Sequence, residues 1–252
     1  MIKVILFGAT GNLGRRILRQ GLNSGLHITA FVRNKEKLMQ QIGQALPDNL
    51  AVIEGDIFDE QAVGSAIEGN NTLINTAGVV SDGERFYDLC QIIMGQAEKQ
   101  LSGPKKVWFL AGAAALDFGS PGIMAVDLPV IPKIFQNHKK NYLSLMKTDL
   151  DWSLMCPGPM VESENDKLTK HLRISTDVMP FDYPSWLLKG PKVGLSLTMK
   201  KYLPETIVSY SDVADIIINN LEEKGQYSYK RIGVALPKGI KGKKENMMPV
   251  SK

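Results

Sequence analysis

The stretch that decides the fold of this chain is Gly8-Ala9-Thr10-Gly11-Asn12-Leu13-Gly14. It follows the almost wholly apolar run Met1–Phe7, which predicts a strand buried on both faces, as in a parallel sheet covered by helices. Beyond the turn, apolar residues recur at helical spacing, at Leu13, Ile17, Leu18 and Leu22. The seven residues therefore predict a tight turn between a buried strand and an amphipathic helix.

The spacing of the three glycines in this turn is typical of a site for a dinucleotide diphosphate. Gly8 permits the tight turn, Gly11 allows backbone amides to approach a diphosphate, and Gly14 lets the helix pack closely on the sheet. The free amides at the helix N-terminus favour an anion, to which Thr10 and Asn12 can add side-chain hydrogen bonds. A turn without a ligand is the alternative, which the strand–turn–helix context disfavours. The expected binding residues are Gly8, Thr10, Gly11, Asn12, Leu13 and Gly14.

The residues after the second predicted strand, over 27–32, bear on which dinucleotide binds. An Asp or Glu at that place would bind the ribose 2′-hydroxyl of NAD. This chain instead has Arg33 followed by Asn34, and a guanidinium can hold a 2′-phosphate through two hydrogen bonds. Arg15 and Lys37 are placed to assist. The sequence thus favours NADP over NAD, with a solvated loop charge as the alternative role of Arg33.

Strand and helix patterns continue to alternate, with short connections, through the first 156 residues. Further strands are predicted over 50–54, 72–75, 106–110 and 152–156, and further helices over 35–43, 61–68, 86–99 and 135–147. This order predicts an α/β fold, a Rossmann-type doubly wound parallel sheet with helices on both faces.

The pattern breaks at Pro157, and residues 157–209 predict a small, irregular, variable insertion on the substrate side. Ser211 is expected to cap a helix over 212–223, and residues 231–235 predict a last strand that closes the sheet. We therefore expect residues 1–237 to form one NAD(P)-binding domain. Residues 238–252 predict a basic, flexible tail, with five lysines against Glu245, a net charge of +4 that equals the formal charge of the whole chain.

Composition limits the classes of function. The chain has 44% hydrophobic and 22% charged residues, as in an ordinary globular protein. No aromatic residues interleave the lysines of the tail, so no nucleic-acid partner is expected. No membrane-length apolar run, signal peptide or metal-ligand spacing is evident. Cys90 and Cys156 read as core residues. The expected setting is the cytoplasm, and the oligomeric state cannot be read.

Several segments together resemble the atypical short-chain dehydrogenase/reductase family. They are the turn GATGNLG, the stretch AFVRNKEKL at 30–38, Glu54-Gly55-Asp56-Ile57 and Asn75-Thr76-Ala77-Gly78. LDWSLMCPG at 150–158 and SDVAD at 211–215 are similar to segments of NmrA-like and flavin/biliverdin-IXβ reductase-like members. The resemblance implies that Asp56 and Ile57 lie against the adenine, that Thr76, Ala77 and Gly78 line the cofactor channel, and that Pro157 lies near the nicotinamide.

The chain departs from the wider family where that family places its proton donor. No tyrosine is followed by a lysine four residues later, and no serine occurs in the segment VWFLAGAAAL at 107–116. The remaining candidates for a catalytic role are His138 and Tyr142, which share a face of the helix over 135–147. Lys139 or Lys140 can meet a cofactor phosphate or ribose, or serve as solvated helix charges.

Two functions follow from these residues. The first is an NADPH-dependent oxidoreductase that reduces a small organic acceptor of flavin, quinone or carbonyl type, a reaction that needs little acid chemistry from the protein. The second is a non-catalytic NADP(H)-sensing regulator of NmrA-like type, which the missing Tyr and Lys favour. A sugar epimerase or dehydratase ranks third. Apolar residues of the substrate side form either a ligand wall or a second small core: Met124, Leu128, Met160, Phe181, Tyr183 and Trp186.

Overall fold

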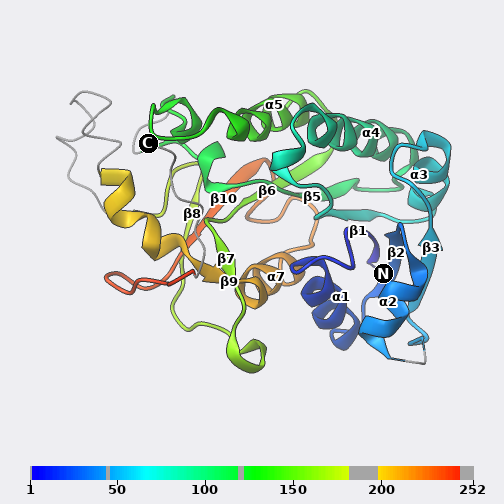
Figure 1. Ribbon diagram of the computed structural model, residues 1–252. Coiled ribbons are helices and arrows are strands. Elements are labelled where there is room, and N and C mark those ends of the chain that lie inside the picture. Colours follow the sequence, from blue (N-terminus) through cyan, green and yellow to red (C-terminus); the bar gives the residue numbers. More distant parts are fainter. Residues whose placement is uncertain (1, 44–45, 119–121, 182–197, 245–252) are drawn as a thin grey trace.

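The protein is built around one eight-stranded sheet (Figure 1). The computed structural model describes residues 2–43, 46–118, 122–181 and 198–244. The strand order is β3-β2-β1-β4-β5-β6-β10-β8, and neighbours are parallel except for β8, which is antiparallel to β10. The strands of this sheet are β1 (Lys3–Phe7), β2 (His27–Val32), β3 (Leu50–Glu54), β4 (Thr72–Asn75), β5 (Lys106–Leu110), β6 (Asp151–Cys156), β8 (Arg173–Thr176) and β10 (Lys230–Ala235).

Helices cover both faces of the sheet, as Figure 1 shows. Helices α1, α2 and α7 lie on one face, and α3, α4 and α5 lie on the other. Their bounds are α1 (Gly14–Asn23), α2 (Lys35–Ile42), α3 (Glu60–Ile67), α4 (Glu84–Gln100), α5 (Gln136–Leu145) and α7 (Tyr210–Ile218). The predicted doubly wound parallel sheet is therefore confirmed.

The alternation of side chains along β1 explains why the core has two halves. Val4 and Leu6 pack into the cluster beneath α1 and α7, whereas Ile5 and Phe7 pack into the cluster beneath α3, α4 and α5. All four side chains are buried, so a continuous apolar run is what this strand requires.

The start of α7 differs from the sequence prediction. Ser209, and not Ser211, is the N-cap: its hydroxyl accepts a hydrogen bond from the Asp212 amide at 3.0 Å, and the Asp212 carboxylate accepts one from the Ser209 amide. The reciprocal pair is a capping box. The helix also ends at Ile218, and Ser211 instead donates to Asp166 at 2.6 Å.

The insertion over 157–209 returns to the sheet, which the sequence did not predict. Its strand β8 pairs with β10, so β10 lies inside the sheet and β8 forms the edge. Two short strands, β7 (Met160–Val161) and β9 (Val208–Ser209), pair with each other immediately before the start of α7. The expected wall residues Tyr183 and Trp186 lie outside the described residues.

The basic tail begins attached to the body of the protein. The Gly242 amide donates to the Pro204 carbonyl at 2.9 Å, and the Ile240 amide donates to Pro237 at 3.0 Å. The rest of the expected flexible tail, from residue 245 on, lies outside the described residues. Within the described part of the chain, no helix has the length and apolar character to cross a membrane.

Candidate functional site

The glycine turn joins β1 to α1 in a shape that requires glycine at two of its three glycine positions. Gly8 has a φ of +83°, and a Cβ there would lie 2.7 Å from the Ala77 backbone nitrogen. A Cβ on Gly14 would lie 2.0 Å from the Gly8 carbonyl oxygen. A Cβ on Gly11 would lie 3.3 Å from the same oxygen, so this position has more space. The turn is thus held against the end of β4, and α1 begins directly on it.

The N-terminus of α1 is prepared for an anion. Its first turn contains no acidic residue, and no side chain caps its free amides. Leu13, immediately before the helix, is buried in the core and can offer only its backbone. Asn12 lies 3.5 Å from the Tyr210 hydroxyl through its side-chain amide, and its carbonyl accepts a hydrogen bond from Arg16. These amides supply the partial positive charge that a diphosphate requires.

A pocket of about 310 Å³ opens at the carboxyl ends of β1, β2, β3 and β4. This is the place where open parallel sheets bind nucleotides. Most residues predicted to bind the cofactor line it, together with several from the start of α4. They are Gly8, Ala9, Thr10, Gly11, Phe31, Val32, Arg33, Lys37, Asp56, Ile57, Phe58, Thr76, Ala77, Gly78, Val79, Asp82, Arg85, Phe86 and Leu89.

Two cations stand at the β2 end of this pocket. Arg33 and Lys37 are exposed, and neither side chain forms an ion pair with any residue that the structure describes. Asn34 lies between them and accepts a hydrogen bond from the Lys37 amide at 2.7 Å, so it caps α2. The carboxylate of Glu54, at the end of β3, accepts a hydrogen bond from the Lys35 amide at 2.8 Å. The pocket therefore offers positive charge at its β2 end that no described acid neutralises.

The other predicted pocket residues shape its floor. The Asp56 carboxylate accepts a hydrogen bond from the Phe58 amide at 3.0 Å, which fixes the loop after β3. Ile57 is buried, and Thr76 donates to the Phe7 carbonyl at 3.0 Å. Gly78 has a φ of +95°. Together with the glycine turn, these residues fit an adenine dinucleotide, with the diphosphate at α1.

His138 lies beside this pocket and does not line it. It is buried between Phe86, which lines the pocket, and Phe135, with ring centroids 5.6 and 6.0 Å away. Its Nδ1 atom has no hydrogen-bond partner among the described residues. Burial lowers the pKa of His138 to about 4, so the imidazole is neutral at pH 7. A Cβ at Gly112, just after β5, would lie 3.1 Å from its Nε2 atom.

Tyr142 lies one helical turn farther along α5 and packs away from the pocket. Its ring contacts Trp152 edge-on, and the Arg231 guanidinium lies 4.6 Å from its centroid. Burial raises the pKa of the Tyr142 hydroxyl. The two lysines between the candidates are in ion pairs, Lys139 with Asp127 at 2.7 Å and Lys140 with Glu84 at 2.6 Å.

The residues predicted for the substrate side also lie outside the lining of the cofactor pocket. Pro157 is buried at the end of β6, where its carbonyl accepts a hydrogen bond from the Ala113 amide at 2.8 Å. Leu128 and Phe181 are part of the core beneath α5, and Met124 packs in a small cluster with Val126. Met160 packs against the core beneath α1 and α7. None of these four residues lines the cofactor pocket, and only Met124 lies in a small core of its own, so neither expected alternative holds for Leu128, Phe181 or Met160.

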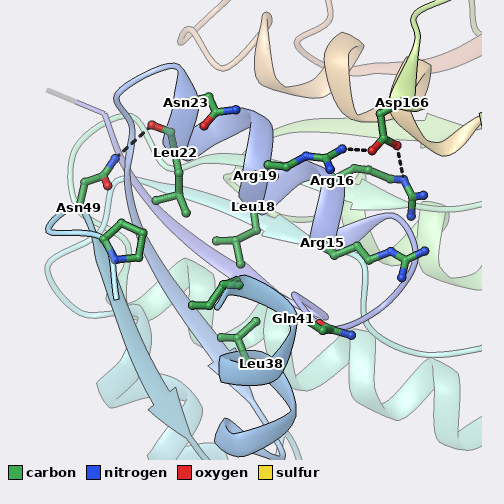
Figure 2. Close-up of a pocket in the computed structure, with 12 residues that line it drawn as sticks. Arg15, Arg16, Leu18, Arg19, Leu22, Asn23, Leu38, Gln41, Asn49 and Asp166 are labelled. Carbon is green, nitrogen blue, oxygen red and sulfur yellow. Dashed lines mark hydrogen bonds and ion pairs between the residues drawn. The ribbon is translucent and has the colours of Figure 1, made fainter. Parts of the chain in front are cut away.

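A second pocket, of about 670 Å³, lies between α1 and α2 and holds an arginine cluster (Figure 2). Asp166, from the insertion, pairs with Arg16 at 3.0 Å and with Arg19. Glu162 pairs with Arg16 and, at 2.9 Å, with Arg15. The acids neutralise most of this charge and fasten the insertion to α1. Arg15, expected to assist at a 2′-phosphate, does not line the cofactor pocket.

Sequence reasoning missed the contribution of α4 to the pocket. Phe58, Arg85 and Phe86 line it, although no motif marks them. The only local sign is that Phe58 follows Asp56-Ile57 in the segment that the resemblance assigns to the adenine. Arg85 comes next to Phe58 only through the packing of α3 against α4.

Comparisons with known proteins agree with this geometry. The model of a family described as NAD(P)H-binding matches residues 8–179. The uncharacterized protein YwnB of Bacillus subtilis is 25% identical over 166 residues, which cover 62% of this chain and 72% of that protein. A Veillonella parvula short-chain dehydrogenase/reductase in complex with NADP has a TM-score of 0.66 at 14% identity, covering 94% of this chain and 95% of that one. A candidate NADH-flavin reductase from Streptococcus pneumoniae has a TM-score of 0.65 at 18% identity, covering 94% and 100%.

The family match spans more than half of the chain and begins at the first glycine of the turn. The solved structures share the parallel sheet and its flanking helices. The chain therefore belongs to the NAD(P)H-binding family and has the fold of the atypical short-chain dehydrogenases/reductases.

Proposed function

We propose that this protein is an NADPH-dependent oxidoreductase that reduces a small organic acceptor of flavin, quinone or carbonyl type. The observation that carries the choice of NADPH is the pair of unpaired cations, Arg33 and Lys37, at the β2 end of the pocket. NADP in one similar structure and the reductase description of another support the proposal. A reducing cytoplasm remains a prediction, with which the buried free thiols of Cys90 and Cys156 agree.

The cofactor supplies hydride when bound, and the residues of the chain bind it, orient it and exclude water. The amides at the start of α1 hold the diphosphate, and Arg33 with Lys37 holds the 2′-phosphate. His138 is neutral at pH 7, so it can donate a hydrogen bond but is not an acid of ordinary strength. The proton for the product then comes from solvent, which suits acceptors that are already reactive.

The test of cofactor choice is Arg33→Asp, with Arg15→Asp as the matched control because Arg15 lies outside the pocket. Fluorescence titration of the Arg33 variant should show a loss of NADPH affinity of about 100-fold, with NADH affinity changed little. The control variant should keep the wild-type ratio of the two affinities. An unchanged ratio in Arg33→Asp would overturn the assignment.

A cofactor-sensing protein without turnover is the second candidate. The packing of Tyr142 on Trp152 and Arg231 favours it, because this leaves no tyrosine hydroxyl at the pocket among the residues that line it. An assay of NADPH oxidation with flavin, quinone and aldehyde acceptors separates the two. Tight binding with no oxidation above the acceptor-free rate would favour the sensor, and acceptor-dependent oxidation would establish the reductase.

A further inference from the structure

The pocket carries a third cation, from α4, which covers the other face of the sheet from α2. Arg85, the second residue of α4, lines the pocket, and its guanidinium carbon lies 4.1 Å from the centroid of the Phe58 ring. That separation places the planar guanidinium over the face of the ring, within the range of a cation–π contact. Phe58 comes from the loop between β3 and α3, so the contact joins this loop to the start of α4 within the lining of the pocket.

Arg85 is not used to balance a nearby acid. The carboxylate next to it in sequence, Glu84, pairs with Lys140 at 2.6 Å. Arg85 itself forms no salt bridge with any of the residues that the structure describes. Its guanidinium therefore keeps its N–H groups and its outer face available to a ligand, while Phe58 holds its inner face.

The location of Arg85 and Phe58 indicates which part of the cofactor they would contact. The diphosphate belongs at α1, and the cations for a 2′-phosphate belong to the start of α2. Arg85 and Phe58 lie on the α3 and α4 side, next to Asp56 and Ile57. A flat group with donors at its edge and a π-system beneath it suits a purine, which has a flat face and ring-nitrogen acceptors.

We propose that Arg85, held over the Phe58 ring, forms the outer wall of the adenine site and determines affinity for NADPH and NADH alike. The proposal rests on dinucleotide binding by the family and not on turnover. It also predicts a pattern that differs from that of Arg33, whose effect is confined to the cofactor with a 2′-phosphate.

The experiment measures the affinities of wild type, Arg85→Leu and Arg85→Lys for NADPH, NADH and reduced nicotinamide mononucleotide, which lacks the adenosine. Lys99→Leu is the matched control, because it removes one positive charge from the last turn of the same helix. In Arg85→Leu, NADPH and NADH should both bind about tenfold more weakly. Arg85→Lys should bind both dinucleotides nearly as weakly as Arg85→Leu does. The affinity of each variant for the mononucleotide should equal that of wild type, and Lys99→Leu should keep all three wild-type affinities.

A double-mutant cycle with Phe58→Leu tests whether the two residues act as one unit. The double variant should bind NADPH no more weakly than the worse single variant, because either change alone disrupts the stack. Circular dichroism confirms that each variant is folded. A loss of NADPH affinity alone would assign Arg85 to the 2′-phosphate and overturn the proposal, as would equal affinities in wild type and Arg85→Leu. Equal affinities in wild type and Arg85→Leu would leave the Arg33 assignment untouched, because Arg33→Asp tests that assignment separately.

Discussion

The glycines of the turn have different roles, and the space around each glycine shows which role it has. Position 11 lines the pocket, and a methyl group there would lie 3.3 Å from the Gly8 carbonyl oxygen, a tight contact, whereas at position 14 the same oxygen would lie at 2.0 Å. The fold depends on Gly14, and the approach of the cofactor depends on Gly11.

We therefore expect Gly11→Ala to lower the free energy of unfolding less than Gly14→Ala does, while weakening NADPH binding about tenfold or more. Gly14→Ala should lower the free energy of unfolding by about 2 kcal/mol, because the new Cβ has no space. Urea unfolding and fluorescence titration of the two variants measure both quantities. Equal loss of stability in the two variants would contradict this division.

At the scale of elements, an ionic contact fastens the insertion to α1 behind the glycine turn. Asp166 accepts hydrogen bonds from Ser211, Arg19 and Arg16, and these donors hold the pKa of its carboxyl well below the usual range. The stabilisation is therefore fully present above the ordinary carboxyl pKa and is lost as the pH falls below it.

Asp166→Asn should lower the free energy of unfolding at pH 7 by about 2 kcal/mol, because hydrogen bonds to a charged acceptor are lost. Glu164→Gln is the matched control, since Glu164 is an exposed neighbour with no ion pair to described residues. Urea unfolding at pH 7 makes the comparison. Similar midpoints for the two variants would show that the contact adds no stability.

The elements also show where sequence reasoning works and where it stops. The strands and helices through residue 156 were predictable, because burial on both faces and helical periodicity are local patterns. The N-cap of α7 was predictable in principle, since Ser209 and Asp212 have the spacing of a capping box and Ser211 lacks an acid three residues later. The antiparallel edge strand β8 was not, because its partner β10 is more than fifty residues away.

The site divides in the same way. The glycine turn, Arg33 and the residues after β3 and β4 could be placed, because a motif fixes their spacing to a strand end. Arg85 and the burial of His138 could not, since both depend on how α4 packs against α3 and α5. Sequence periodicity predicts which face of a helix is buried but not which neighbour it meets.

At the scale of the whole molecule, stability against acid reflects the buried His138. Its pKa is lowered from 6.5 to about 4 in the folded protein, so the unfolded chain takes up a proton between these values and the folded one does not. The contribution to stability is complete above pH 6.5 and is lost as the pH falls toward 4. It should amount to about 2 kcal/mol between pH 7 and pH 5.

His138→Gln should show a correspondingly flatter dependence of the free energy of unfolding on pH between 7 and 5. The matched control is His171→Gln, because His171 is exposed. Urea unfolding at several pH values gives the slopes, and the control should keep the wild-type slope. A wild-type slope in His138→Gln would show that another group is responsible.

The order of segments along the chain has a consequence for how such a protein can diverge. Every residue that lines the cofactor pocket lies before residue 90, whereas the insertion enters only after β6. The insertion is tied to α1 by Glu162 and Asp166, which form ion pairs with Arg16, whereas its strand β8 pairs with β10, outside the nucleotide-binding part. The insertion can therefore be exchanged or altered during evolution while residues 1–90 keep the nucleotide-binding pocket. The condition is that the new insertion keeps acidic residues opposite Arg16.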